Sequence, residues 1–382
     1  MEEKKAEWIS KTTEKLKEKV AWVSTRSQNK IPYTTVNKVH DDKSIPSASQ
    51  DDGLNWWCNG FFGGMMSLMY HETKEERYIN IVRGIEEKLD TCFSNFYGLH
   101  HDVGFMWLPT AVADYRLTGN LVSKTRGLHA ASLLAGRFNP VGNFIRAWND
   151  PKPKDSSNKG WAIIDCLLNI PLLYWASEET NDPRFRQIAM LHADTARKYF
   201  VRPDGSVRHI VEFNPETGEM IKDYAGQGYA LGSSWTRGQA WGLYGFVMSY
   251  IHTKKQEYLD TAKQIAHYFI SNIPEDGLIL ADFRQPKEPV WYDDSAAAIA
   301  ASGLLELSKQ CNSVDAEIYE IAALKLLIAL DQNHCDYTKD NDGIVQNCSV
   351  AYYGEHEINL IYADYFFLEA ILKLKGTDFF LW

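Results

Sequence analysis

The stretch GWAIIDCLLNIPLLYWAS, residues 160–177, is apolar at nearly every position and carries a single carboxylate, Asp165. A helix that is apolar all round is buried, whereas a helix with one polar face lies at the surface. The stretch therefore predicts a buried helix. Similar apolar segments rich in small residues occur at 59–70, 104–115, 238–250, 293–307 and 362–374.

Charged, amphipathic segments with helical spacing alternate with the apolar ones. They lie at 6–27, 74–93, 123–138, 182–200, 254–273 and 314–334. Six helices of each kind form six hairpins, which can close into an (α/α)6 barrel or stack as an open solenoid. Closure is favoured because the inner helices are too apolar to leave a concave face wet. The sequence thus predicts an all-α (α/α)6 barrel, decorated by a β-hairpin at 209–221.

Composition limits the classes of partner. The 382 residues carry a formal net charge of −10, so a broad nucleic-acid or anionic-membrane surface is not expected. The N-terminal sequence lacks the apolar stretch of a secretory signal peptide, so none is expected. No run of eighteen apolar residues occurs, so no membrane-spanning helix is expected. The six cysteines contain no CxxC and are expected to be reduced. We expect one domain over 1–382, cytoplasmic, monomeric or weakly oligomeric, without nucleic-acid or membrane partners.

The loops that precede the apolar segments combine Trp, Gly, His, Arg and Asp. In a closed barrel the starts of the inner helices gather at one end, so these loops would build the main cleft. Glycine permits close approach of a ligand to the backbone, and tryptophan offers a flat apolar face. The loops are 51–60, 98–104, the region of Trp148, 224–242 and 288–295.

Asp165 is predicted to lie inside an apolar helix. A carboxylate among Ile and Leu neighbours costs several kcal/mol unless it is paired or protonated. A raised pKa would make this carboxyl a proton donor at neutral pH. The structural alternative is a buried aspartate bonded to a helix N-terminus or to Asn169.

Asp102, in GLHHDVGF, precedes the second apolar segment. It could be a helix N-cap, or it could face the cleft beside His100 and His101. Two carboxylates in one cleft can share a proton, which separates their pKa values and suits acid/base chemistry on a sugar. Three other aspartates are weaker candidates for these acid/base roles: Asp293, Asp294 and Asp364.

Arg237, in SSWTRGQAWG, is the candidate for holding an acidic group, because a guanidinium binds a carboxylate bidentately. Trp235 and Trp241 flank it and could stack on a ligand. The alternative is a structural cation–π contact. Gln227 and His209 could hydrogen-bond a hydroxyl. The run His100–Asp102 has no matching ligand set elsewhere, so no metal site is expected.

Four motifs, GLHHDVGF, GWAIIDCLLNIPLLYWAS, SSWTRGQAWGLYGF and ADYFFLEAILKL, together resemble the unsaturated glucuronyl hydrolases of glycoside hydrolase family 88. The resemblance runs in order from Trp56 to Leu374. It implies an (α/α)6 barrel without metal or organic cofactor. It also implies hydrolysis of lyase-generated, glycosaminoglycan-type oligosaccharides that end in a 4,5-unsaturated uronic acid.

The resemblance also implies residue roles. Asp165 would protonate C4 of the C4=C5 vinyl ether and activate the water that adds at C5. Asp102 would be the second essential aspartate, which positions the substrate. The hemiketal then collapses to release the shortened sugar. The positions implied to bind substrate are Trp56, His101, Trp148, His209, Gln227, Trp235, Arg237 and Trp241.

The loop QNCSVAYYGEHEIN, residues 346–359, departs from some family members, which bind substrate sulfate there with Ser and Lys. Ser349 is present, but Glu355 stands about where the Lys would help. We therefore expect poor use of substrates sulfated at that subsite, with Tyr352 or Tyr353 stacking on the next sugar. The alternatives are an unsaturated rhamnogalacturonyl hydrolase, another (α/α)6 enzyme such as a sugar epimerase, and a non-catalytic helical-repeat scaffold.

Overall fold

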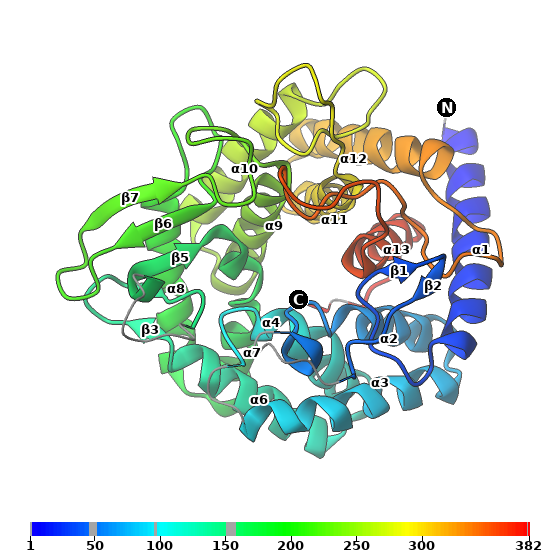
Figure 1. Cartoon of the computed structure of the whole chain (residues 1–382), viewed down its shortest axis with the longest axis horizontal. Helices are drawn as coiled ribbons and strands as arrows, with labels where there is room; N and C mark the ends of the chain where they lie inside the picture. Colours follow the sequence, from blue (N-terminus) through cyan, green and yellow to red (C-terminus); the bar gives the residue numbers. More distant parts are fainter. Residues whose placement is uncertain (1, 46–51, 95–97, 150–157, 380) are drawn as a thin grey trace.

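The computed structural model describes residues 2–45, 52–94, 98–149, 158–379 and 381–382. Outer and inner helices alternate along the chain and close into a ring (Figure 1). The outer helices are α1 (Glu2–Arg26), α3 (Glu76–Leu89), α6 (Leu121–Ala135), α8 (Pro183–Tyr199), α10 (Gln256–Ser271) and α12 (Ser313–Asn333). The inner helices are α2 (Phe61–Thr73), the α4–α5 rod, α7 (Pro171–Thr180), α9 (Thr236–Thr253), α11 (Asp294–Lys309) and α13 (Ile361–Lys375).

The α4–α5 rod is one inner helix with a local irregularity. Its two α-helical parts are α4 (Val103–Trp107) and α5 (Ala113–Thr118), joined by a π-helical turn (Leu108–Val112) that contains Pro109. Proline has no N–H to donate within a helix, so the regular hydrogen-bond ladder is interrupted there. With this rod taken as one helix, the described residues contain the twelve predicted helices, and the (α/α)6 barrel is confirmed.

Ring closure brings the first and last inner helices together. Phe61, at the start of α2, packs against Tyr365 and Phe366 of α13, with centroid separations of 5.4 and 5.6 Å. Both α2 and α13 are buried over most of their length because their sequences lack a polar face. Closure therefore removes the apolar inner surface that an open solenoid would leave exposed.

Short strands lie among the loops. The predicted hairpin is confirmed as β6 (Ile210–Phe213) and β7 (Met220–Tyr224). A third strand, β5 (Trp161–Ile163), was not predicted; it pairs antiparallel with β6 so that Ile163 opposes Ile210. Within the described ranges, β1 (Thr35–Val36) also pairs with β2 (Val39–His40), and β3 (Phe138–Asn139) pairs with β4 (Phe144–Ile145). The 3-10 turns are Gly53–Asn55, Asp90–Ser94, Asn158–Gly160 and Ile164–Leu168.

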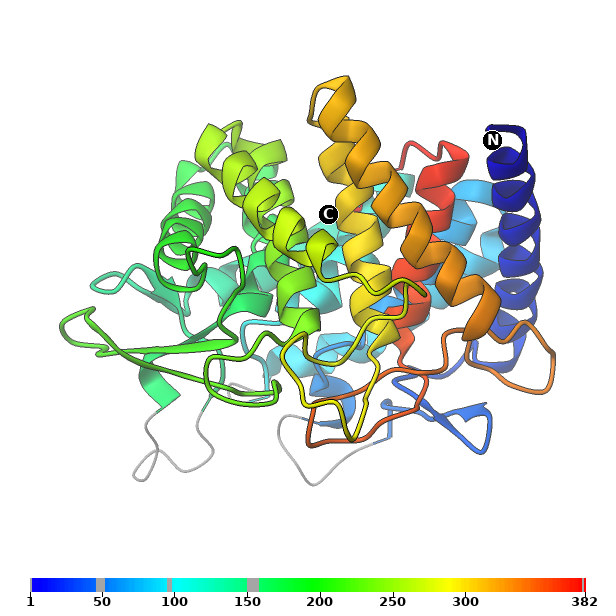
Figure 2. The same cartoon turned by 90° about the horizontal axis from the view of Figure 1, so that it is seen from above.

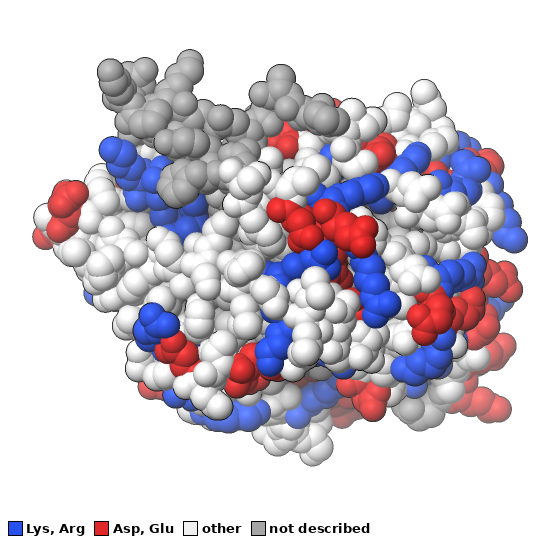
Figure 3. Space-filling model, turned by 90° about the horizontal axis from the view of Figure 1, so that it is seen from below, with Lys and Arg blue, Asp and Glu red and all other residues white. Residues whose placement is uncertain are grey.

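The strands and long loops gather at one end of the barrel (Figure 2). On the side that Figure 3 draws, the described Lys and Arg side chains lie among Asp and Glu side chains. In the described part of the chain, every helix is too short or too polar to span a lipid bilayer.

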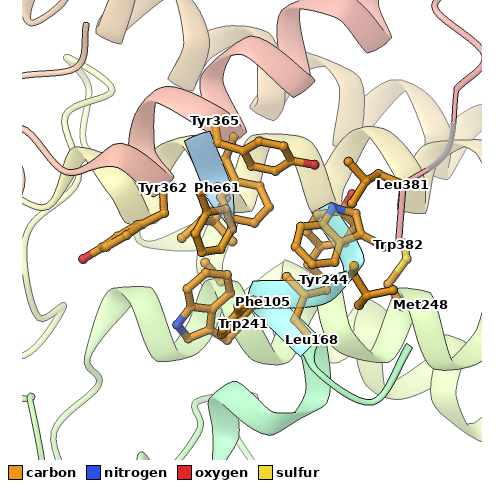
Figure 4. Close-up of a cluster of buried hydrophobic side chains, with 14 of the residues drawn as sticks. Phe61, Phe105, Leu168, Trp241, Tyr244, Met248, Tyr362, Tyr365, Leu381 and Trp382 are labelled. Carbon is orange, nitrogen blue, oxygen red and sulfur yellow. The ribbon is translucent and has the colours of Figure 1, made fainter. Parts of the chain in front are cut away.

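Trp382 fills the middle of the ring. The last residue lies near the barrel axis (Figure 1) and is fully buried. Figure 4 shows the indole among buried hydrophobic side chains. It stacks on Phe366 at 5.7 Å between ring centroids, and its Nε1 donates a hydrogen bond of 2.7 Å to Glu369. The indole is part of the same hydrophobic core as the inner helices.

We expect Trp382→Ala to lower the free energy of unfolding by about 3–5 kcal/mol, because it removes a buried indole and leaves a cavity. Urea unfolding followed by circular dichroism measures the change. Trp382→Phe, which keeps an aromatic ring but not the Nε1 donor, should lose clearly less. A loss for Trp382→Ala within error of zero would contradict the packing described.

Candidate active site

A cavity of about 380 Å³ lies where the inner helices begin. Seven of the ten residues predicted for the site line it, and Trp57 and His100 join them. The lining residues are Trp56, Trp57, His100, His101, Asp102, Trp148, Asp165, Gln227 and Arg237. Of the predicted mouth loop 51–60, residue 51 lies outside the described residues.

Asp165 precedes the regular α-helix rather than lying inside it, so the predicted buried helix starts later than expected. It sits on the 3-10 turn Ile164–Leu168, between β5 and α7. Pairing of β5 with β6 keeps the preceding residues extended, and the regular helix begins only at Pro171, which suits a first helical position. The turn places Asp165 on the cavity wall, where 17% of its side chain remains exposed.

The environment of Asp165 favours its protonated form. Burial, followed by the negative charge of Asp102, raises the pKa of Asp165 to about 7, against smaller opposing effects of His101 and Arg237. The Oδ1 atom lies 3.8 Å from His209 Nε2 and accepts no hydrogen bond from the described residues. Asp165 can therefore carry a proton near neutral pH and present it to a ligand in the cavity.

Asp102 has the opposite character. It occupies the N-cap position of α4, but its side chain makes no capping hydrogen bond. Oδ1 instead accepts a 3.0 Å bond from Asn169 Nδ2, and Oδ2 lies 3.2 Å from His101 Nε2 and 3.4 Å from His100 Nδ1. Burial alone would raise the pKa of Asp102, but these neighbours together lower it below its ordinary value. The cavity thus combines an aspartate whose surroundings favour the ionised form with one whose surroundings favour the protonated form.

His100, His101 and Asp102 also bring their ligand atoms within 4.8 Å of one another. Three such donors can hold a metal ion, although a closed structural zinc site uses four. Because both histidines approach the same oxygen of Asp102, they stabilise its charge. We interpret the group as a support for the ionised carboxylate.

Arg237 is buried in the first turn of α9, and the structural cation–π contact considered for it is present. Its guanidinium donates to Asp293 Oδ2 at 2.5 Å and to the carbonyls of Ser349 and Val350 at 2.6 and 2.5 Å. It also lies 4.6 Å from the ring centroid of Trp235. The side chain is thereby fixed on the cavity wall, and a ligand carboxylate would meet a cation that is already oriented.

His209 and Trp235 stand outside the set of residues that line the cavity. The Nδ1 atom of His209 accepts a 2.9 Å bond from the Gln227 N–H, which leaves Nε2 to carry the proton that faces Asp165. Burial, then the charge of Arg237, lowers the pKa of His209 to about 3, so the ring is neutral. Trp235 packs against this ring at 4.3 Å. His209 and Trp235 therefore lie behind the cavity wall and support residues that form it.

Trp241 does not line the cavity, and its prediction as a stacking surface at the mouth was wrong. It is fully buried in the core beside Phe105 (Figure 4), with ring centroids 4.9 Å apart. The ring centroid of Phe366 lies 5.6 Å away. Trp241 lies one helical turn beyond Arg237, so it projects deeper into a barrel that aromatic side chains already fill.

The competing aspartates have structural partners. Asp293 pairs with Arg237 and caps α11 through the N–H of Ser295. Asp294 lies 2.8 Å from His334 Nδ1. Asp364 accepts hydrogen bonds from two backbone N–H groups and from Asn359 Nδ2. Their low ranking agrees with these contacts.

Trp57 and Asn169 were not predicted as site residues, whereas His100 was expected at the cleft mouth and lies there. Trp57 adjoins Trp56, so its place in the same loop was the available signal. Asn169 was considered only as a partner that could make Asp165 structural. In the structure its side-chain amide binds Asp102, whereas for Asp165 it reaches the backbone carbonyl, at 3.2 Å.

Comparison with known proteins fixes the family. The sequence profile of Glycosyl Hydrolase Family 88 matches residues 23–376. An unsaturated glucuronyl hydrolase of Bacillus sp. (strain GL1) is 38% identical over 329 residues, which cover 84% of this chain and 86% of that protein.

The chain belongs to Glycosyl Hydrolase Family 88.

Solved structures agree with this family 88 assignment. A structure described as UGL with dGlcA-Glc-Rha-Glc superimposes with a TM-score of 0.86 at 32% identity, covering 94% of this chain and 95% of the other. A variant of the Streptococcus agalactiae unsaturated glucuronyl hydrolase complexed with dGlcA-GalNAc6S gives a TM-score of 0.80 at 28% identity, covering 97% and 93%. As a member of family 88, the chain is a glycoside hydrolase.

The loop 346–359 of this family 88 chain lies against the cavity wall. Ser349 is buried and donates a 2.6 Å hydrogen bond to the Tyr292 carbonyl. Its hydroxyl therefore ties the loop to the neighbouring segment. Tyr352 is buried, whereas Tyr353 is 77% exposed and lies 6.5 Å from Tyr229. Glu355 is exposed.

Proposed function

We propose that the enzyme removes 4,5-unsaturated uronic acid from the non-reducing end of lyase-generated, glycosaminoglycan-type oligosaccharides. The observation that carries the proposal is the pair of aspartates in one cavity, with Asp165 protonated near neutral pH beside an ionised Asp102. The names of the relatives and the sugars in their complexes support the substrate class.

In the proposed mechanism, Asp165 donates its proton to C4 of the C4=C5 vinyl ether. The ring oxygen then shares the positive charge that develops at C5. The ionised Asp165 takes a proton from a water molecule, and the hydroxide equivalent bonds to C5 to give a hemiketal. Ring opening forms the C5 carbonyl and leaves a hemiacetal at C1, which expels the shortened sugar as an alcohol. Asp165 ends the cycle protonated, as it began.

The surrounding residues suit this chemistry. Arg237 presents a fixed cation for the uronate carboxylate. Trp56, Trp57 and Trp148 supply flat apolar faces for sugar rings. Asp102, which is ionised, stabilises the positive charge of the transition state and can position the attacking water.

A single assay tests the proposal. Unsaturated chondroitin, heparin-type and rhamnogalacturonan disaccharides are incubated with the enzyme, and ultraviolet absorbance and sugar release are followed together. Hydration predicts that the alkene absorbance is lost in step with sugar release. Release of a sugar that keeps its absorbance would indicate displacement at the anomeric carbon and overturn the mechanism. Turnover of the rhamnogalacturonan product alone would favour the rhamnogalacturonyl alternative.

We expect unsulfated substrates to be used better than those with a sulfate near Glu355, because the carboxylate repels the sulfate. Glu355→Lys should improve kcat/KM for the sulfated substrate relative to the unsulfated one by about fivefold, the effect of about 1 kcal/mol for an exposed pair. Glu216→Lys, which makes the same charge change in the turn between β6 and β7, is the control. An unchanged ratio for Glu355→Lys would place the sulfate elsewhere.

We also propose that residues 1–382 work as one catalytic domain in the cytoplasm. All six cysteines are free in the structure, which suits a reducing compartment.

A further inference from the structure

Asn169 lies between the two aspartates and is fully buried. It follows the 3-10 turn that carries Asp165 and packs directly on the first turn of α4. A Cβ atom at Gly104 would lie 2.5 Å from the Asn169 backbone, so the two segments meet without an intervening side chain. The amide is therefore held in a fixed place between the two segments.

The hydrogen bonds of Asn169 fix which way its amide points. The Phe105 N–H donates to Asn169 Oδ1 at 2.8 Å, and a backbone N–H can only donate. The NH2 group therefore faces the other way, where it donates to Asp102 Oδ1 at 3.0 Å and to the Asp165 carbonyl at 3.2 Å. One side chain thus ties the carboxylate of Asp102 to the backbone of Asp165.

We propose that Asn169 is a positioning residue of the reaction, which holds Asp102 as a hydrogen-bond acceptor and sets its place relative to Asp165. The inference rests on the proposed function. A donor to a carboxylate favours its ionised form. The charge of Asp102 in turn helps to keep Asp165 protonated, so the amide acts on the acid through Asp102.

Other charged or titratable groups also face Asp102, and they remain in every variant below. They are His100, His101, Arg137, Asp165, Cys166 and His209. A comparison of wild type with variants at position 169 therefore isolates the contribution of the amide.

The test is the pH dependence of kcat/KM for Asn169→Ala, measured by loss of alkene absorbance. The proposal predicts a fall of about 10- to 100-fold, as expected for a lost hydrogen bond to a charged group. It also predicts that the acid limb moves up by about one pH unit, because Asp102 then binds a proton more readily. A variant profile that superimposes on the wild-type profile after scaling by one factor would show a merely structural residue and overturn the inference.

The chain offers a matched control in Asn359. Its buried Nδ2 also donates to an aspartate, Asp364, and to a backbone carbonyl, that of Val345, both at 2.9 Å, but it does not line the cavity. Asn359→Ala should lower stability and leave the shape of the pH profile unchanged.

A second variant covers the case in which Asn169→Ala does not fold. In Asn169→Asp the new carboxyl group still accepts from Phe105, and it can donate to Asp102 only while protonated. Its activity relative to wild type should therefore fall as pH rises, whereas a constant ratio would overturn the proposal. Absence of turnover by the wild type would instead refute the proposed function.

Discussion

Asp165→Asn is expected to lower kcat by about 10³-fold or more while KM changes little. An amide cannot deliver a proton to carbon, and positioned general acids contribute up to about 10⁴-fold. The substitution keeps the size of the side chain. It also keeps the backbone carbonyl that binds Asn169, so the cavity should be preserved. Initial rates of alkene loss and binding of the unsaturated disaccharide by calorimetry measure the two effects.

The matched control for this variant is Asp364→Asn. Burial raises the pKa of Asp364 to about 7, as it does for Asp165, but Asp364 does not line the cavity. Asp364→Asn should lower stability, because the carboxylate accepts backbone N–H bonds, and should leave kcat unchanged. Normal turnover by Asp165→Asn would remove Asp165 from the mechanism, whatever its pKa.

The barrel could be predicted because its signal is repeated six times. Each apolar segment needs a partner that covers it, and only closure buries all of them. Local irregularities could not be predicted in the same way. The strand Trp161–Ile163 has three residues, and its pairing with β6 depends on a hairpin some fifty residues away. The 3-10 turn that carries Asp165 follows directly on this paired strand.

The site could be predicted to the level of its loops and its two acids. Side chains at the mouths of inner helices must converge in a closed barrel, so Asp102 and Asp165 were found together. Whether each of the other predicted side chains reaches the cavity depends on its depth along the barrel. Trp235 and Trp241 look equivalent around Arg237 in the sequence, yet one lies beside His209 at the mouth and the other lies in the core. Spacing alone does not tell how deep in the barrel a side chain lies.

Wild-type activity should fall as pH rises through about 7, because only protonated Asp165 can donate. Asp102→Asn removes the negative charge that helps to raise the pKa of Asp165, so the basic limb of the kcat/KM profile should move to lower pH. We expect a shift of about one pH unit and a fall in kcat of about 10²-fold or more from loss of electrostatic stabilisation. A limb that stays in place or moves up would show that the two acids do not interact.

Asp102→Asn and Asn169→Ala together assign the acid and basic limbs of the kcat/KM profile to separate groups. Loss of the amide should move the acid limb, because it changes how readily Asp102 is protonated. Loss of the Asp102 charge should move the basic limb, because it changes how readily Asp165 is deprotonated. The amide of Asn169 can still donate to the new side chain of Asp102→Asn, so the hydrogen bond is kept while the charge is lost. If both variants moved the same limb, that limb would belong to the pair as a coupled unit rather than to either aspartate.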